Sequence, residues 1–215
     1  MHLSLIGMSG SGKSYWANQL AASGFMRFSC DEMIASRLKS ELKRPDGKLM
    51  PMGKWMGFPY QPGYSARESK YLNYEKQVLR EIFGFIAHGP TRTEKDIVID
   101  TTGSVIYTGK DILKSLRKYT TVVHLATPPE IQEQMFLAYL KSPRPVLWRG
   151  QFIRRPGEKN REALARCYPQ LLAYRGRLYE HNAHLTMAYD RYRKKGLNAA
   201  GFLEALELNS GNQLY

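Results

Sequence analysis

The chain has few cysteines and no long apolar run. Only two of its 215 residues are cysteines, Cys30 and Cys167, too few for a disulfide framework or a metal quartet, and a reducing compartment is the simpler account. No segment approaches the roughly 18 apolar residues that a membrane-spanning helix needs, and the first six residues lack the apolar core of a secretion signal. We therefore expect a soluble, cytoplasmic protein with no membrane partner.

Acidic residues are also scarce. The sequence holds 19 Asp and Glu against 32 Lys and Arg, which gives a formal net charge of +13. Such a charge attracts nucleotides, phosphorylated metabolites, nucleic acids or anionic surfaces, and the charge alone does not indicate which of these the protein binds. Basic residues gather between residues 144 and 161 and between 175 and 195, where a solvated face is the simpler interpretation for most of them.

Internal repeats are absent too, and short apolar runs instead alternate with amphipathic stretches, as in an α/β fold. The pattern predicts strands near residues 2–7, 25–29, 96–100, 120–125 and 183–188. It predicts helices near residues 13–22, 31–41, 66–87, 108–117, 129–141, 159–181 and 197–208. Such an order implies a five-stranded parallel sheet covered on both faces, with a ligand at the carboxyl ends of the strands. The length favours a single domain over residues 1–215.

Two segments interrupt this alternation. Residues 43–65 are rich in proline, glycine and aromatic residues, which predicts an insertion on the acceptor side of a site. Residues 141–158 combine arginines and prolines with Trp148 and Phe152, which predicts a lid that closes over phosphates.

The run from Gly7 to Ser14 matches the phosphate-binding pattern G-x-x-x-x-G-K-[ST], and it lies between a predicted strand and a predicted helix. The residues expected to hold phosphates are Gly7, Ser9, Gly10, Ser11, Gly12, Lys13 and Ser14. Lys13 is expected to reach the β- and γ-phosphates of ATP, and Ser14 to bind Mg²⁺. The alternative is a glycine- and serine-rich turn that matches by chance.

Two aspartates follow predicted strands. Asp100 ends the apolar run 97–99 and is a candidate second ligand of Mg²⁺, directly or through water, or else a cap of the next turn. Asp31 opens the helix after the second strand, so it is either an N-cap or the carboxylate that orients an acceptor hydroxyl and takes its proton. Glu32 is the weaker candidate and is expected on the helix surface.

Taken in order, these segments resemble the shikimate kinase-like small-molecule kinases, within the nucleoside-monophosphate-kinase branch of phosphate-loop NTPases. The resemblance runs through LSLIGMSGSGKS, FSCDEMIASRL, VIDTTGSVIY, VVHLATPPE, SPRPVL and AYRGRLYEHNAHLTM. It implies a P-loop three-layer sandwich, α/β in class, with strand order 2-3-1-4-5. It also implies that Asp31 contacts the acceptor hydroxyls, that Arg144 of the lid lies over the nucleotide, and that Arg175 grips the acceptor.

The chain departs from that family at several positions. Thr102 and Gly103, expected to face the acceptor, stand with Thr101 where the family has three glycines. Leu72 stands where the family has a carboxylate-binding arginine, and Arg67, one helical turn away, is a candidate substitute. Ser29 replaces the first of two paired aspartates. These departures favour an acceptor other than shikimate.

The aromatic residues of the insertion have two interpretations. Trp55, Phe58 and Tyr60 either stack on a ligand or form a small satellite core that holds the insertion together. The arginines of the lid also have two interpretations. One or two of them contact the transferred phosphate, and the remainder are solvated.

The function that this pattern favours is an ATP- and Mg²⁺-dependent kinase acting on a hydroxyl of a small polar metabolite, with Lys13, Asp31 and Arg144 as catalytic residues. One alternative is a kinase of nucleotides or RNA ends, which the positive charge would suit. Another is a regulatory module that binds ATP and a macromolecule without catalysis.

Overall fold

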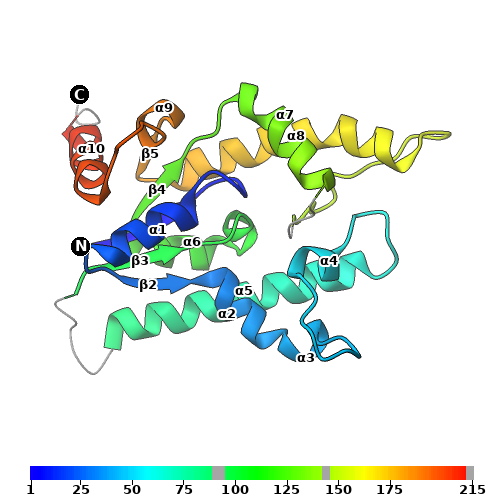
Figure 1. The fold of residues 1–215 in the computed structure, drawn as a ribbon, viewed down its shortest axis with the longest axis horizontal. Helices are drawn as coiled ribbons and strands as arrows, with labels where there is room; N and C mark the ends of the chain where they lie inside the picture. The colour runs from blue at the N-terminus through cyan, green and yellow to red at the C-terminus, as the bar shows by residue number, and fades with distance from the viewer. Residues whose placement is uncertain (89–94, 142–145, 212–215) are drawn as a thin grey trace.

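The computed structural model describes residues 1–88, 95–141 and 146–211. Its centre is a five-stranded, all-parallel sheet in the order β2-β3-β1-β4-β5 (Figure 1). The strands are β1 (His2–Ile6), β2 (Met26–Ser29), β3 (Ile97–Asp100), β4 (Thr121–Leu125) and β5 (Leu185–Met187). The predicted α/β class and strand order are therefore confirmed.

Helices cover both faces of the sheet, because successive side chains of a strand point to opposite faces. Leu3 and Leu5 of β1 lie on the face covered by α1 (Lys13–Ala22) and α10 (Ala199–Gly211), where Trp16 stacks on Phe202 with ring centroids 4.3 Å apart. Ile97 and Ile99 of β3 lie on the other face, against α5 (Tyr64–His88), α6 (Lys110–Tyr119) and α8 (Asn160–Asn182). Two apolar cores thus flank one sheet, giving the three layers.

The helix boundaries differ from the predicted ones at a few points. The helix predicted over 31–41 is divided into α2 (Cys30–Arg37) and α3 (Lys39–Leu42), and the short helix η1 (Val105–Tyr107) precedes α6. Two further helices are α7 (Pro129–Lys141) and α9 (Tyr189–Tyr192). Within the described ranges, none of the helices has the length and apolar character needed to cross a membrane.

The insertion at 43–65 is largely irregular, as expected, but it contains one short helix, α4 (Met52–Met56). Its aromatic residues pack against other segments of the protein. The Phe58 ring stacks on Tyr60 at 5.5 Å and meets Tyr139 of α7 edge-on at 5.4 Å, while Tyr60 lies 6.0 Å from Phe152. These contacts favour the satellite-core interpretation over stacking on a ligand.

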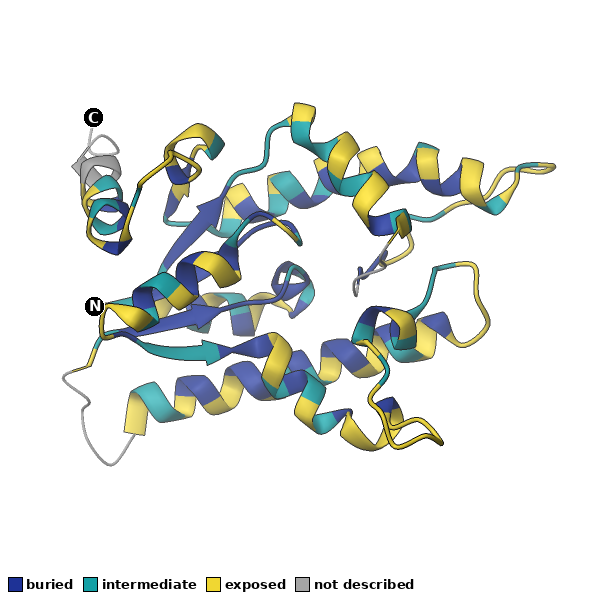
Figure 2. Ribbon diagram, in the orientation of Figure 1, coloured by how far each residue is buried: buried dark blue, intermediate teal, exposed yellow. Residues whose placement is uncertain are grey.

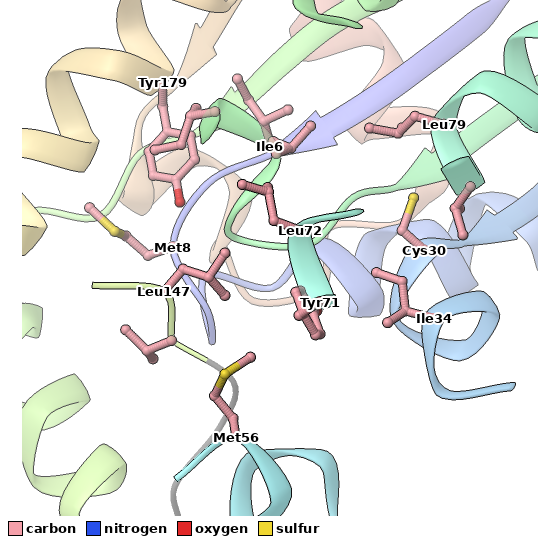
Figure 3. Packing of buried hydrophobic residues seen from close by; sticks show 14 of the residues in the cluster. Ile6, Met8, Cys30, Ile34, Met56, Tyr71, Leu72, Leu79, Leu147 and Tyr179 are labelled. Atoms are coloured by element: carbon pink, nitrogen blue, oxygen red, sulfur yellow. The ribbon is translucent and has the colours of Figure 1, made fainter. Parts of the chain in front are cut away.

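The described part of the lid, residues 146–158, is attached to the beginning of α5. The Tyr64 hydroxyl lies 2.7 Å from the Val146 carbonyl oxygen and accepts a hydrogen bond from the Trp148 amide at 3.0 Å. Glu68 accepts a hydrogen bond from the Arg149 amide at 2.9 Å. The apolar core continues into this region, since Met8, Met56 and Leu147 belong to one cluster (Figure 3). Beyond Trp148 the lid extends into solvent as an exposed tip (Figure 2).

Candidate active site

The loop between β1 and α1 adopts a backbone that only glycine accommodates easily. Gly7 and Gly12 have φ angles of 144° and 104°, in the region that L side chains rarely adopt. A Cβ atom at Gly7 would lie 2.8 Å from the Leu125 carbonyl oxygen and 3.1 Å from Ser11 Oγ, so a side chain there would clash. The loop leads directly into α1, whose first residue is Lys13, as in a phosphate-binding loop.

Lys13 folds back over this loop. Its ammonium group donates hydrogen bonds to the carbonyl oxygens of Gly7 at 3.0 Å and Met8 at 2.8 Å, and the residue is only 6% exposed. The Ser11 amide closes a turn onto the Met8 carbonyl oxygen at 3.1 Å. The positive charge of Lys13 is thereby held at the beginning of α1, where the helix dipole also favours an anion.

A cavity of about 170 Å³ lies beside the loop. It is lined by Ser9, Gly10, Lys13, Ser14, Asp31, Met52, Tyr71, Thr102 and Gly103. Seven of these residues were predicted site residues, from three separate segments of the sequence. This is many times the roughly 10–15 Å³ that a cavity needs to hold one water molecule, so the space can take a small metabolite.

Asp31 lies in the first turn of α2 and lines the same cavity as the phosphate loop. The helix is capped by Ser29, whose side chain accepts a hydrogen bond from the Glu32 amide at 3.4 Å, so the N-cap interpretation of Asp31 is wrong. The Tyr71 hydroxyl donates a hydrogen bond to Asp31 Oδ1 at 2.7 Å. Tyr71, from α5, therefore fixes the direction of the Asp31 carboxylate.

The carboxyl group of Glu75, four residues after Tyr71 on α5, is fully buried. The hydroxyl groups of Thr102 and Ser104 both donate hydrogen bonds to it, the second at 2.5 Å. Burial raises the pKa of Glu75 to about 7, with the Asp31 charge adding to the rise, while the two hydroxyls and Arg175 partly oppose it. Glu75 thus orients Thr102 and carries a proton that titrates near neutral pH.

Gly103 connects the cavity to Arg175 of α8. The guanidinium group of Arg175 and the hydroxyl group of Tyr179 both donate hydrogen bonds to the Gly103 carbonyl oxygen. A Cβ atom at Gly103 would lie 2.8 Å from the Arg175 guanidinium and 3.4 Å from the Ser9 amide nitrogen. Arg175 is 3% exposed and does not line the cavity, so its contact with the site passes through Gly103.

Asp100 lies at the carboxyl end of β3, as predicted, but it is paired with a cation. Its carboxylate accepts a hydrogen bond from Arg27 of β2 at 3.1 Å, and the same guanidinium binds Glu32, also at 3.1 Å. Asp100 is 4% exposed and does not line the cavity. Glu32 lies on the helix surface, as expected, with 71% of its side chain exposed.

Arg67, like Arg175, is not among the described residues that line the cavity. Arg67 donates hydrogen bonds to the carbonyl oxygens of Met56 at 3.0 Å and Pro62 at 3.1 Å, so it binds the insertion rather than the cavity. Arg144 lies outside the described residues.

His124 of β4 is a further buried group beside the phosphate loop. Its ring stacks on Tyr179 at 5.3 Å and lies close to Gly7. Burial lowers the pKa of His124 to about 4, and the nearby Lys13 charge contributes to the same shift. The imidazole is therefore neutral at physiological pH, and it packs against the phosphate loop without adding charge.

Sequence reasoning missed Tyr71, Glu75, Arg27, Tyr179 and Met52. Tyr71 and Glu75 occupy one face of α5, four residues apart, and both are buried. A glutamate and a tyrosine on the apolar face of an amphipathic helix were the available signal, since charged residues are almost never fully buried without a partner.

A phosphate loop at the carboxyl edge of a parallel sheet in this order defines the class of P-loop α/β proteins. Within that class, the chain has the fold of the shikimate kinases. The shikimate kinase from Acinetobacter baumannii, solved in complex with shikimate, has a TM-score of 0.59 at 22% identity, over 100% of this chain and 95% of that one. The enzyme from Bacteroides thetaiotaomicron has a TM-score of 0.57 at 16% identity, over 97% of both chains.

The shikimate kinase from Aquifex aeolicus is similar to the same degree, with a TM-score of 0.56 at 18% identity, over 100% of this chain and 99% of that one. No family model matches the chain, and no curated protein sequence does. Identities of this size establish the fold and leave the acceptor open.

Proposed function

We propose that this protein is a kinase that transfers the γ-phosphoryl group of ATP to a hydroxyl of a small polar metabolite. One observation carries the proposal: Lys13 and Ser14 of the phosphate loop line the same cavity as Asp31. A phosphate-binding lysine and a carboxylate that line one small cavity are two parts that phosphoryl transfer to an alcohol requires. The fold that the chain shares with shikimate kinases supports the same reaction class.

The phosphate loop would hold the triphosphate. Backbone N–H groups of the loop and the beginning of α1 favour negative charge, and Lys13 would exchange its carbonyl partners for the β- and γ-phosphates. There it would stabilise the charge that develops during transfer. Arg144 is proposed to approach the nucleotide from the lid.

For the adenine base of ATP we propose a second hollow next to the phosphate loop. A hollow of about 360 Å³ lies between α1 and the segment after β5. Gly12 and Tyr15 line one side, and Arg193 and Asn198 the other. Arg193 also donates a hydrogen bond to the Gly10 carbonyl oxygen at 3.2 Å, which joins this segment to the phosphate loop.

Ser14 lines the cavity beside the loop and offers a hydroxyl oxygen, a kind of ligand that Mg²⁺ prefers. When bound, Mg²⁺ would neutralise part of the negative charge of the triphosphate. We assign Ser14 as its protein ligand, with Asp100 acting through water, because Mg²⁺ keeps several waters and takes further oxygens from phosphates. Arg27 holds the Asp100 carboxylate in place from the neighbouring strand.

Asp31 is proposed to orient the acceptor hydroxyl and take its proton, with Tyr71 fixing the carboxylate. Thr102 and Gly103 form the adjoining wall, and Arg175 positions that wall through the Gly103 carbonyl oxygen. For Arg67 we propose a supporting role, since its hydrogen bonds hold the insertion that places Met52 at the cavity.

An ADP-release assay tests this function. Purified protein with Mg-ATP is offered sugars, polyols, hydroxy acids, nucleosides and short RNAs, with Lys13→Ala as the blank. The expected result is ADP release that depends on a small acceptor and disappears in the blank.

Other outcomes would favour the alternative functions. Stimulation by RNA alone, weakening steeply with added salt, would favour an RNA-end kinase. Tight ATP binding without stimulation by any acceptor would favour a regulatory module.

A further inference from the structure

Thr102 lines the cavity and is hydrogen-bonded to a buried carboxyl group. Its hydroxyl group contacts Glu75 Oε1, and the Ser104 hydroxyl group contacts Oε2 of the same carboxyl group at 2.5 Å. The Ser104 amide donates a further hydrogen bond to Thr102 Oγ1 at 3.0 Å. Glu75 has no exposed surface, so a change in its protonation acts directly on these two hydroxyl groups.

The ionised form of Glu75 limits what Thr102 can offer to a ligand. A threonine hydroxyl group has one proton to donate and two lone pairs that accept. The Thr102 proton is donated to the Glu75 carboxylate, and the Ser104 amide occupies one lone pair. Thr102 can therefore accept a hydrogen bond from a ligand in the cavity, but it cannot donate one.

The neutral form of Glu75 allows the opposite arrangement. With its proton on Oε1, Glu75 donates to Thr102 Oγ1, so that Glu75 and the Ser104 amide occupy both lone pairs. The Thr102 proton is then released from Glu75, and it can be donated to a ligand in the cavity that Thr102 lines.

The surroundings of Glu75 place this exchange near neutral pH. Burial raises the pKa of Glu75 to about 7, and the Asp31 charge adds to the rise, while the two hydroxyl groups and the Arg175 charge oppose it. The titratable groups that interact with Glu75 come from three helices: Tyr71 of α5, Asp31 and Cys30 of α2, and Arg175 and Tyr179 of α8. Burial raises the pKa of the thiol and of both phenols, so these three groups stay neutral while Glu75 titrates.

We propose that Glu75 is a positioning residue that sets the direction of the hydrogen bond between Thr102 and the ligand: Thr102 accepts when Glu75 is ionised and donates when Glu75 is neutral. This inference rests on the proposed kinase function, because it concerns the specificity of the same cavity. A ligand group that only accepts hydrogen bonds, such as a carboxylate, then binds more tightly at the lower pH. A hydroxyl group both donates and accepts, so it fits either state.

Carbon NMR of the protein without ligand tests the coupling between the two residues. The Glu75 carboxyl carbon and the Thr102 methyl carbon are followed from about pH 5.5 to about pH 8.5. We expect both signals to change with one shared midpoint. The Thr102 signal should lose this midpoint in Glu75→Gln and keep it in Glu81→Gln, a matched control on an exposed side chain of the same helix. A Glu75 carboxyl group that does not titrate in this range, or a Thr102 signal that does not follow it, would overturn the inference.

Two probes measure the consequence for ligands. Glycerate has a carboxylate that stays ionised above about pH 5, whereas glycerol has hydroxyl groups alone. Each is titrated into the wild type with Mg²⁺ and a non-hydrolysable ATP analogue at about pH 6 and about pH 8, and the Thr102 methyl signal reports binding. We expect glycerate to bind about fivefold or more weakly at the higher pH, because it loses a hydrogen bond from Thr102 and meets the Glu75 charge. The affinity for glycerol should change less than about twofold, since its hydroxyl groups fit both states.

Thr102→Val separates the hydrogen bond from the charge. It removes the hydroxyl group while Glu75 still titrates, as its carboxyl signal checks, so most of the pH dependence of glycerate binding should disappear. An undiminished pH dependence in a folded Thr102→Val protein would overturn the inference. Equal affinity of the wild type for glycerate at both pH values, or a Thr102 signal that neither probe moves, would do so as well. These measurements do not use phosphoryl transfer, so an absence of transfer would contradict the kinase proposal alone.

Discussion

Asp31 acquires its proposed role from its neighbours. Its local sequence equally suited a helix cap, but Ser29 caps α2, and the Asp31 carboxylate is held toward the cavity by Tyr71. A carboxylate oriented in this way can accept a proton from a hydroxyl that attacks a phosphoryl group.

The Asp31→Asn variant should therefore lose transfer but retain ATP binding. Removing a positioned base costs roughly 10²- to 10⁴-fold in kcat, whereas the phosphate loop is untouched. Steady-state turnover on the identified acceptor, together with titration of a fluorescent ATP analogue, measures both effects. Near-normal turnover in Asp31→Asn would show that the proposed role is wrong.

Glu75 makes the stability of the fold depend on pH. Because its pKa is raised from 4.5 to about 7, the folded state binds more protons than the unfolded state between these values. The free energy of unfolding contributed by this group therefore falls as the pH rises from about 4.5 to about 7, by on the order of 3 kcal/mol. Asp31 and Arg175, which face Glu75, act on its pKa in opposite directions.

Urea unfolding of wild-type protein and Glu75→Gln at several pH values measures this contribution. The free energy of unfolding of the wild type, minus that of Glu75→Gln, should decrease as the pH increases across this range. A difference that stays constant from pH 4.5 to 8 would contradict the raised pKa.

The residues that the sequence predicted are those whose chemistry is local. Gly7, Gly12, Lys13 and Ser14 lie within one loop, so their spacing alone indicates a phosphate site. Arg27 was not predicted, because its significance depends on Asp100, 73 residues away in the sequence and adjacent only through the pairing of β2 with β3. Tyr71 depends in the same way on Asp31.

At the scale of elements, the insertion and the lid are one connected structure. Tyr64 and Glu68, at the beginning of α5, bind the backbone of residues 146–149. The contact of Tyr60 with Phe152 joins the insertion to the lid, and the contact of Phe58 with Tyr139 joins the insertion to α7. We therefore expect the lid and the insertion to open and close together, excluding water from the cavity as a unit.

Tyr64→Phe tests this connection. The change removes a buried hydroxyl that is hydrogen-bonded to two residues of the lid, Val146 and Trp148, and losing such bonds costs about 1–3 kcal/mol of stability. Faster amide hydrogen exchange at Trp148 is expected as well. Tyr60→Phe, on a residue that is 38% exposed, is the matched control. Equal exchange rates at Trp148 in both variants would contradict the connection.

The elements themselves were largely predictable. Each of the five strands lies within two residues of its predicted limits, because buried strands in parallel sheets are continuous apolar runs. The short helices α3, α4 and α9 were not predicted as separate elements, since four or five residues are too few for a helical period to appear. The contacts of the lid with α5 could not be predicted either, because they join side chains of α5 to backbone groups about 80 residues away in the sequence.

At the scale of the whole molecule, two apolar cores share one sheet. Residues of β1 contribute to both, Leu3 and Leu5 to one core and Ile6 to the other. We propose that residues 1–215 form a single domain that unfolds cooperatively. Far-UV circular dichroism and tryptophan fluorescence should then give coincident urea transitions, since Trp16 and Trp148 report on different cores. Two separated transitions would contradict this proposal.

We propose that phosphoryl transfer to an alcohol takes place in the cavity that the phosphate loop and Asp31 line. The most direct measurement follows the γ-phosphorus of ATP by ³¹P NMR in the presence of the acceptor from the ADP-release assay, comparing the wild type with Lys13→Ala. We expect the wild type to form a new phosphate monoester in amounts that match the ADP released, and Lys13→Ala to form none. ADP accompanied only by inorganic phosphate, or a monoester formed equally by Lys13→Ala, would contradict the proposal.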